Sequence, residues 1–288
     1  MNYKNFSGCG TALITPFRNG EVDYAAFAGL VERQVKGDMD FLVPLGTTGE
    51  TPCLEDDERI KVLQTAKENA GGLPILVGGG TNSLKHTVRS MQMLDPYGVD
   101  AFLIVVPYYN KPTQEGMYAH FKAISEATDL PVILYNVPGR TGVNMLPDTT
   151  LRIAADCKNV VGIKEASGNI EQIEYILRHR PEGFKVFSGD DGITLPLMKS
   201  GADGVISVLG NAYAAEFAEL VHLAQTADFA AAETIDKRFT ELYKLLFVDG
   251  NPAGVKCLME LRGMLQNILR LPLVPATQST RDKIAAQL

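Results

Sequence analysis

The chain has 288 residues, of which 45% are hydrophobic and 21% are charged, and this composition is typical of a globular protein. At this length the chain can bury a large core, either in one α/β barrel or in two smaller domains. The net charge of −7 and the absence of a basic run argue against general nucleic-acid binding.

The cysteines and the N-terminal segment indicate the compartment in which the protein works. The cysteines Cys9, Cys53, Cys157 and Cys257 are far apart and form no C-x-x-C pair, so we expect reduced thiols rather than a disulfide framework or a zinc site. The N-terminal segment MNYKNFSGCG lacks the apolar core of a signal peptide, and no apolar run approaches the roughly 20 residues of a membrane span. These features predict a cytoplasmic protein.

Short apolar runs of β-type residues recur along the chain and predict eight strands. They lie at 12–15, 41–45, 74–79, 101–107, 131–136, 160–164, 185–189 and 204–208. Most of them show little alternation of polar and apolar residues, which is typical of parallel strands that are covered on both faces.

Amphipathic helical patterns fill the intervals between these runs. Asp23 is a suitable N-cap for a helix that places Phe27, Leu30, Val31 and Val35 on one face. Comparable apolar faces follow with Met117, Phe121 and Ile124, and then with Ile170, Ile173, Ile176 and Leu177. The segments 68–72 and 84–98 each end in glycine, a common helix stop.

This alternation predicts a (β/α)8 TIM barrel over residues 1–225. A doubly wound open sheet would alternate in the same way, but no G-x-G-x-x-G opens a helix after the first strand, so dinucleotide binding has no support. Residues 226–288 carry helical patterns without a strand signal. We expect them to form a C-terminal helical subdomain that caps the barrel or mediates oligomerisation, with a helix near 251–269 whose apolar face holds Val255, Leu258, Met259 and Leu265.

Lys164 is the first candidate for chemistry, because it ends the apolar run of the sixth strand. With a side-chain period of two it shares a strand face with Gly162, and we expect that glycine to leave room for the lysine side chain. Loss of water disfavours an ammonium ion, so the pKa should fall, and a free amine is a nucleophile that forms a Schiff base with a ketone.

Two alternatives to this interpretation of Lys164 stand beside it. A structural lysine would pair with Glu165 or Glu171, although the strand period turns Glu165 to the opposite face. Lys256 is a rival nucleophile, but its helical pattern predicts a solvated surface group.

Other strand ends carry further candidates. Tyr135 ends the adjacent fifth strand, where its hydroxyl could pass a proton during imine formation, or where its ring could simply cap the core. The loop GTTGE at 46–50 offers backbone N–H groups and the hydroxyls of Thr47 and Thr48 to a carboxylate, although a plain turn is equally compatible. Arg140 could bind a second carboxylate or form a surface salt bridge. The adjacent acids of SGDD at 188–191 alternate in direction, and we expect no metal.

The motifs GTTGE, PYYNKP, YNVPGRTG, GIKEASG and SGDD follow one another in order at the predicted strand ends. From about residue 7 to 275 the chain resembles the dihydrodipicolinate synthase and N-acetylneuraminate lyase family of pyruvate-dependent class I aldolases. The resemblance implies Schiff-base condensation of pyruvate with L-aspartate 4-semialdehyde to 4-hydroxy-tetrahydrodipicolinate in diaminopimelate and lysine biosynthesis, without an external cofactor. An alternative is a lyase for N-acetylneuraminate or a 2-keto-3-deoxy sugar acid, against which Arg140 and the SGDD loop argue. A barrel that has lost catalysis and only binds pyruvate is a third possibility.

The resemblance also implies roles for individual catalytic residues. Lys164 would capture pyruvate as a Schiff base, and Tyr135 would donate and accept protons. Thr47 and Tyr109 would complete a hydroxyl relay to solvent, with Tyr109 supplied by a neighbouring subunit. The resemblance therefore implies a homotetramer of tight dimers, in which a separated monomer loses activity.

The implied substrate-binding residues surround this group. Thr48, with backbone groups near Gly189 and Ile206, would hold the pyruvate carboxylate and the surroundings of the lysine. Arg140 would bind the carboxylate of the incoming aldehyde.

One region departs from the family pattern. Lysine-inhibited relatives often carry two histidines and a glutamate in a regulatory cleft between subunits. Here Asn82 and Tyr108 match that pattern, but Asp56, Arg59 and His86 do not. We therefore expect weak or absent inhibition by lysine.

Overall fold

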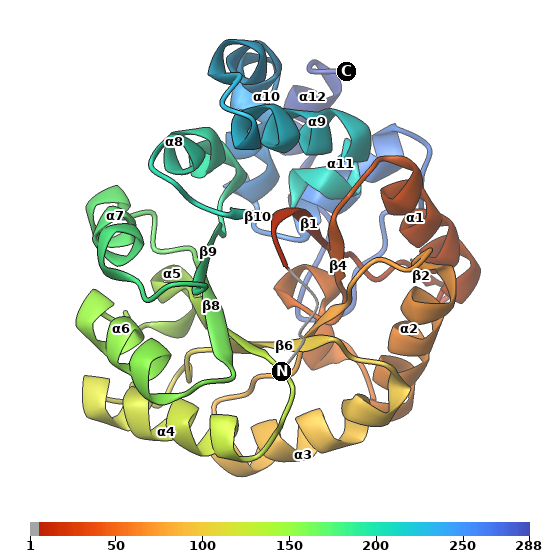
Figure 1. The fold of residues 1–288 in the computed structure, drawn as a ribbon. Coiled ribbons are helices and arrows are strands. Elements are labelled where there is room, and N and C mark those ends of the chain that lie inside the picture. The colour runs from red at the N-terminus through yellow and green to blue at the C-terminus, as the bar shows by residue number, and fades with distance from the viewer. Residues whose placement is uncertain (1–5) are drawn as a thin grey trace.

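A computed structural model describes residues 6–288. Residues 1–5 lie outside this range, and they form half of the segment MNYKNFSGCG for which no signal peptide was predicted. Eight parallel strands form one sheet in the order β4-β1-β10-β9-β8-β7-β6-β5, and an isolated bridge between Leu42 and Ile75 joins β4 to β5 (Figure 1). The strands are β1 (Gly8–Ala12), β4 (Phe41–Val43), β5 (Leu76–Gly78), β6 (Ala101–Val105), β7 (Val132–Asn136), β8 (Val160–Glu165), β9 (Lys185–Ser188) and β10 (Gly204–Ser207). The closed ring confirms the predicted barrel.

Eight helices surround this ring, as a (β/α)8 fold requires. They are α1 (Tyr24–Lys36), α2 (Asp56–Asn69), α3 (Leu84–Leu94), α4 (Gln114–Glu126), α6 (Pro147–Asp156), α7 (Ile170–His179), α8 (Thr194–Lys199) and α9 (Ala214–Gln225). Asp23 caps α1 as predicted, since its carboxylate accepts a hydrogen bond from the Ala26 N–H at 3.0 Å.

Two apolar layers explain why the strand sequences barely alternate. One layer lies between the strands and the helices, and the other fills the barrel itself. Inside the barrel the ring of Phe41 contacts those of Phe6 and Phe187 edge to face, with centroids 5.5 and 5.6 Å apart. Both faces of most strands are therefore buried.

The first strand lies at Gly8–Ala12, four residues before the run predicted at 12–15, and that prediction was wrong in position. A Cβ atom on Gly10 would come within 2.1 Å of the Phe41 ring, so a large side chain on one strand requires a glycine on its neighbour. The resulting strand sequence GCGTA has no valine, isoleucine or aromatic residue, and Thr11 is its one β-branched residue.

Short elements at the carboxyl ends of the strands were not predicted. A two-stranded ribbon, β2 (Phe17–Arg18) and β3 (Glu21–Val22), follows β1, and the one-turn helix α5 (Pro138–Thr141) follows β7. The 3-10 turns η1 (Thr47–Gly49) and η2 (Thr51–Cys53) follow β4, η4 (Asp191–Ile193) follows β9, and η5 (Leu209–Asn211) follows β10. A further turn, η3 (Asp95–Tyr97), extends α3.

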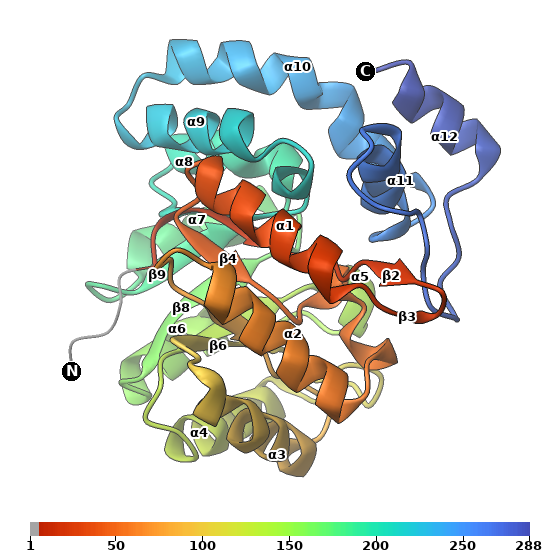
Figure 2. The same cartoon turned by 90° about the vertical axis from the view of Figure 1, so that its right-hand side faces the viewer.

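The C-terminal region is helical, as predicted. It contains α10 (Phe229–Val248), α11 (Ala253–Leu261) and α12 (Gln278–Ala285), which Figure 2 shows stacked along one side of the barrel beside α9 and the β2–β3 ribbon. The helix expected near 251–269 is shorter, because Gly263 has a φ of +69° just beyond its end, and Leu265 lies outside it. The division of the chain into domains at residue 225 stays a prediction. None of the helices described combines the length and the apolar character that a bilayer span requires.

Candidate active site

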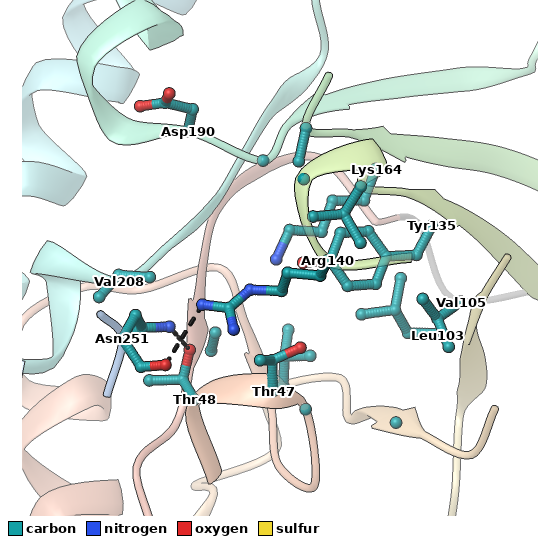
Figure 3. A pocket seen from close by; sticks show the side chains of 18 of the residues that line it. Thr47, Thr48, Leu103, Val105, Tyr135, Arg140, Lys164, Asp190, Val208 and Asn251 are labelled. Carbon is teal, nitrogen blue, oxygen red and sulfur yellow. Dashed lines mark hydrogen bonds between the residues drawn. The ribbon is translucent and has the colours of Figure 1, made fainter. Parts of the chain in front are cut away.

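A cavity of about 1020 Å³ opens at the carboxyl ends of the strands, where TIM-barrel sites lie (Figure 3). Its walls come from most of the βα loops and from α10. The lining includes Thr47, Thr48, Tyr135, Arg140, Lys164 and Gly189, so the cavity brings together six of the eight site residues inferred from sequence.

Lys164 lies on β8 with only 5% of its surface exposed. The strand register pairs it with Tyr135 of β7, and its Nζ lies 4.5 Å from the centre of the Tyr135 ring. No ion pair involves Lys164 within residues 6–288. The sequence argument that adjacent strand ends bring this lysine and this tyrosine together is confirmed.

Glu165 does not act as the partner of Lys164. Its carboxylate accepts hydrogen bonds from the side chains of Asn136 (3.1 Å) and Gln172 (2.8 Å) and from the Ser167 N–H (2.8 Å) on the outer face of the strand. Burial raises the pKa of this carboxyl group, while the same hydrogen bonds oppose the shift. Glu171, the other proposed partner, is exposed on α7.

The glycine that makes room for Lys164 is Gly189, and the assignment of this role to Gly162 was wrong. A Cβ on Gly162 would come within 2.7 Å of the Lys185 carbonyl oxygen on the neighbouring strand. A Cβ on Gly189 would instead come within 3.1 Å of the Lys164 Cε and 2.6 Å of the Ala166 Cβ. The two-residue period of a strand identifies which side chains share a face of that strand. The space available to a side chain inside the barrel depends on residues of the neighbouring strand.

The GTTGE loop is built from the two consecutive 3-10 turns η1 and η2. Glu50 joins them with a φ of +53°, and its N–H donates to the Thr47 carbonyl oxygen at 3.1 Å. Because the first N–H groups of a helical turn have no partner within the turn, those of Thr47 and Thr48 suit an anion. Thr48 is buried, whereas Thr47 is half-buried and lines the cavity.

Arg140 lies exposed on α5 at the edge of the cavity. Its Nη2 donates to the Asn251 carbonyl oxygen at 3.2 Å, and no salt bridge to Arg140 occurs in the described part of the chain. Figure 3 shows its guanidinium group reaching across the cavity mouth toward Asn251 and Thr48. The alternative of a surface salt bridge is wrong, and the group can still form a bidentate pair with a carboxylate.

Asn251 is a site residue that the sequence argument missed. It is buried, and its Nδ2 donates to the Thr48 Oγ1 at 2.9 Å, so it joins the C-terminal region to the GTTGE loop. The polar residue before Pro252, at the start of a predicted helix, was the available signal. Thr240, Tyr243 and Phe247 of α10 also line the cavity.

Two predicted site residues lie apart from this group. Tyr109 is 87% exposed, has a φ of +72° and is not part of the cavity lining of its own chain. Ile206 is buried inside the barrel in the apolar cluster that contains Tyr135 and is likewise not part of the lining.

Lys256 is fully buried, so its prediction as a solvated surface group was wrong. Its Nζ lies 2.5 Å from the Glu50 Oε1, and neither side chain has any exposed surface. Burial lowers the pKa of the Lys256 ammonium group to about 8, with Glu50 acting in the opposite direction. A helical pattern does not reveal the burial of a lysine that pairs with a residue 206 positions away.

The two acids of the SGDD loop have different surroundings. Asp190 lines the cavity, whereas Asp191 is buried and accepts hydrogen bonds from the N–H groups of Val208 (3.1 Å) and Leu209 (2.8 Å). Burial raises the pKa of Asp191 to about 6. Within residues 6–288 no group of three or more histidines, cysteines or acids is arranged to hold a metal ion, and all four cysteines are free thiols.

Comparison with known proteins extends these observations to the whole chain. The model of the dihydrodipicolinate synthetase family matches residues 5–288. A 4-hydroxy-tetrahydrodipicolinate synthase of Phocaeicola vulgatus is 55% identical over 290 residues, which cover 100% of this chain and 98% of that protein. The crystal structure of dihydrodipicolinate synthase from Thermotoga maritima superposes with a TM-score of 0.96 at 44% identity, over 98% of this chain and 97% of that one. A monomeric dihydrodipicolinate synthase variant gives the same TM-score and identity, over 98% and 95% of the two chains.

Proposed function

The chain belongs to the dihydrodipicolinate synthetase family, and from this premise we propose that it condenses pyruvate with L-aspartate 4-semialdehyde to 4-hydroxy-tetrahydrodipicolinate. The observation that carries the proposal is Lys164, which is buried at the cavity, has no ion-pair partner among residues 6–288 and stands beside Tyr135. A buried lysine without a carboxylate partner suits covalent catalysis, because only the free amine attacks a ketone.

The first half of the reaction forms a nucleophile from pyruvate. The Lys164 amine attacks the ketone carbon, and the resulting carbinolamine loses water to give an imine. Tyr135 supplies the proton that leaves with that water, with Thr47 next in the relay. The protonated imine withdraws electrons from the methyl group, which loses a proton to the Tyr135 oxygen and gives an enamine. Thr48 and the free N–H groups of its turn hold the pyruvate carboxylate.

The second half joins the two substrates. The enamine carbon attacks the aldehyde carbon of the semialdehyde, while Arg140 binds the carboxylate of that substrate at the cavity mouth. The aldehyde oxygen takes a proton from Tyr135 and becomes a hydroxyl group. The amine of the substrate then attacks the imine carbon, closes the ring and releases Lys164 as a free amine.

Pyruvate consumption by the purified protein tests this proposal directly. With L-aspartate 4-semialdehyde as partner we expect turnover, and with N-acetylmannosamine we expect none. Turnover with the sugar alone would move the chain to the sugar-acid lyase alternative. If neither partner supports turnover although pyruvate binds, the chain would be the non-catalytic barrel.

Arg140 determines the affinity for the second substrate. An Arg140→Ala variant is expected to raise the KM for the semialdehyde about 100-fold, because it removes a bidentate, charge-assisted pair. Capture of pyruvate on Lys164, followed by borohydride reduction, should be unchanged. Arg152→Ala removes an arginine that pairs with Glu115 on the outer helices, and this control should retain the wild-type KM.

A homotetramer of tight dimers is part of the proposal, with Tyr109 entering the cavity of the neighbouring subunit. Its support is the position of Tyr109, which is largely exposed and outside its own cavity. Tyr109→Phe and Lys164→Met proteins should each be nearly inactive, yet subunits mixed after dissociation should regain up to about a quarter of wild-type turnover. The mixed dimer has one site with both groups. Absence of complementation, or full turnover by a monomeric variant, would contradict the shared site.

Weak inhibition by lysine is a further part of the proposal. Arg59 pairs with Asp56 at 3.3 Å and donates to the Ser90 Oγ at 2.5 Å, so a cation already occupies the region where a lysine ammonium group would bind. Turnover should therefore be unaffected by lysine at micromolar concentrations. Inhibition in that range would overturn the expectation, and an Arg59→Glu variant should increase the sensitivity.

The cytoplasm is the proposed location. Four free thiols suit a reducing compartment.

A further inference from the structure

The fully buried ion pair between Glu50 and Lys256 has no part in the reaction derived above. The Lys256 Nζ donates to the Glu50 Oε1 at 2.5 Å and to the Ile268 carbonyl oxygen at 2.9 Å. The Arg270 N–H donates to the other carboxylate oxygen of Glu50 at 3.0 Å. Both oxygens of the carboxylate are therefore bound by groups from the C-terminal region, which satisfies the requirement of a buried charge for compensating partners.

Glu50 is directly coupled to the threonines of the cavity. Its left-handed backbone conformation is unfavourable for a residue with a side chain, so surrounding contacts must hold it. Its N–H donates to the Thr47 carbonyl oxygen at 3.1 Å, and it is the residue at which η1 ends and η2 begins. A shift of the Glu50 carboxylate would therefore move the turn that carries Thr47 and Thr48.

The segment just before α11 makes a second connection to the cavity. Asn251, five positions before Lys256, donates to the Thr48 Oγ1 at 2.9 Å and accepts from the Arg140 Nη2 at 3.2 Å. The Arg270 Nη1 donates to the Cys53 carbonyl oxygen at 2.9 Å, at the end of η2. The C-terminal region thus holds both ends of the GTTGE loop segment.

We propose that Lys256 and Glu50 are positioning residues, through which α11 fixes the turn of Thr47 and Thr48 in the geometry that the reaction at Lys164 requires. The inference rests on the proposed function, because it assigns those threonines to proton transfer and to the pyruvate carboxylate. According to this proposal, the C-terminal region contributes to catalysis by positioning Thr47 and Thr48. A purely stabilising ion pair would be replaceable by neutral groups without kinetic effect.

Two variants separate positioning from stability. Lys256→Met removes the ammonium group but leaves a buried carboxylate without its partner, and that variant should unfold at a lower temperature. The double variant Lys256→Met/Glu50→Gln contains no unpaired buried charge, and its glutamine can still accept from the Arg270 N–H. It is expected to recover most of the lost Tm. Arg281→Met is the matched control, because it removes the partly exposed pair with Glu260 from the same helix, away from the cavity.

The measurements are Tm, kcat, the KM for pyruvate, and the amount of pyruvate fixed on Lys164 by borohydride. In the folded double variant we expect kcat to fall about tenfold to 100-fold, because small misplacement of reacting groups has effects of this size. Pyruvate should still be captured on Lys164, and the control should keep the wild-type kcat. A folded double variant with wild-type kcat and KM would overturn the inference.

The outcome for wild-type protein keeps the two proposals distinguishable. Wild-type protein that turns over N-acetylmannosamine instead of the semialdehyde would contradict the proposed function alone. The same variants, assayed with the sugar, would then still test whether α11 positions the threonine turn.

Discussion

A Lys164→Met variant is expected to lose turnover by at least about 10⁴-fold and to take up no borohydride-fixed pyruvate. Methionine keeps the length and apolar character of the lysine stem, so the packing against Gly189 is preserved and the barrel should fold with a Tm close to that of the wild type. The loss then reports on the amine alone.

The matched experiment locates the adduct within the chain. Peptide mapping of reduced wild-type protein should find pyruvate on the peptide that contains Lys164 and not on Lys256, a second buried lysine whose pKa is lowered by burial. Lys185→Met alters a lysine of the adjacent strand that pairs with Asp203, and it should leave the adduct unchanged. Pyruvate found on Lys256, or turnover that survives in Lys164→Met, would show that the nucleophile is another group.

Tyr135→Phe is expected to lower kcat by about 100-fold to 1,000-fold, the size of effect that a positioned acid–base group usually has. The ring of Tyr135 is buried among the apolar side chains of the barrel, and phenylalanine retains that packing. Tm should therefore change little. Single-turnover formation of the pyruvate adduct should slow with kcat, because loss of water from the carbinolamine needs the hydroxyl proton.

Tyr118→Phe is the control for this measurement. The Tyr118 hydroxyl donates to Asp156 at 2.8 Å on the outer helices, so its loss should affect stability slightly and kcat not at all. Should Tyr135→Phe retain kcat within a factor of two of the wild type, a water molecule or another hydroxyl would have to be the proton donor.

The features that could be predicted from sequence are those set by local patterns. Seven of the eight strands follow from apolar runs, and helices α1 to α4 and α7 follow from their periodicity, caps and glycine stops, because each of these elements is buried along a continuous face. The first strand was predicted four residues too late, because the Phe41 ring on the neighbouring strand leaves room only for a glycine at position 10. Nothing within the segment GCGTA itself indicates that constraint.

In the candidate site, too, local sequence patterns predict some residues, whereas others are placed by contacts between distant segments. Lys164 and Tyr135 could be brought together from sequence, since both end neighbouring parallel strands and the register follows from the fold. Asn251, Lys256 and Arg270 could not, because they contact the GTTGE loop from more than 200 positions away, through helices whose packing a periodic pattern does not specify. The role of Gly189 depends in the same way on the distance to a side chain of another strand.

The pairing of β1 with β10 has a consequence for the order in which the chain folds. Gly8 pairs with Gly204, so one edge of the first strand stays open until most of the polypeptide has left the ribosome. The hydrogen bonds from Lys256 to the Ile268 carbonyl oxygen and from the Arg270 N–H to Glu50 form later still. A nascent chain can therefore pair the strands that lie between β1 and β10 in sequence first. The turn of Thr47 and Thr48 is held by its C-terminal contacts only when synthesis is nearly complete. Long-range contacts of this kind slow folding, and they also ensure that a prematurely terminated chain lacks a finished site.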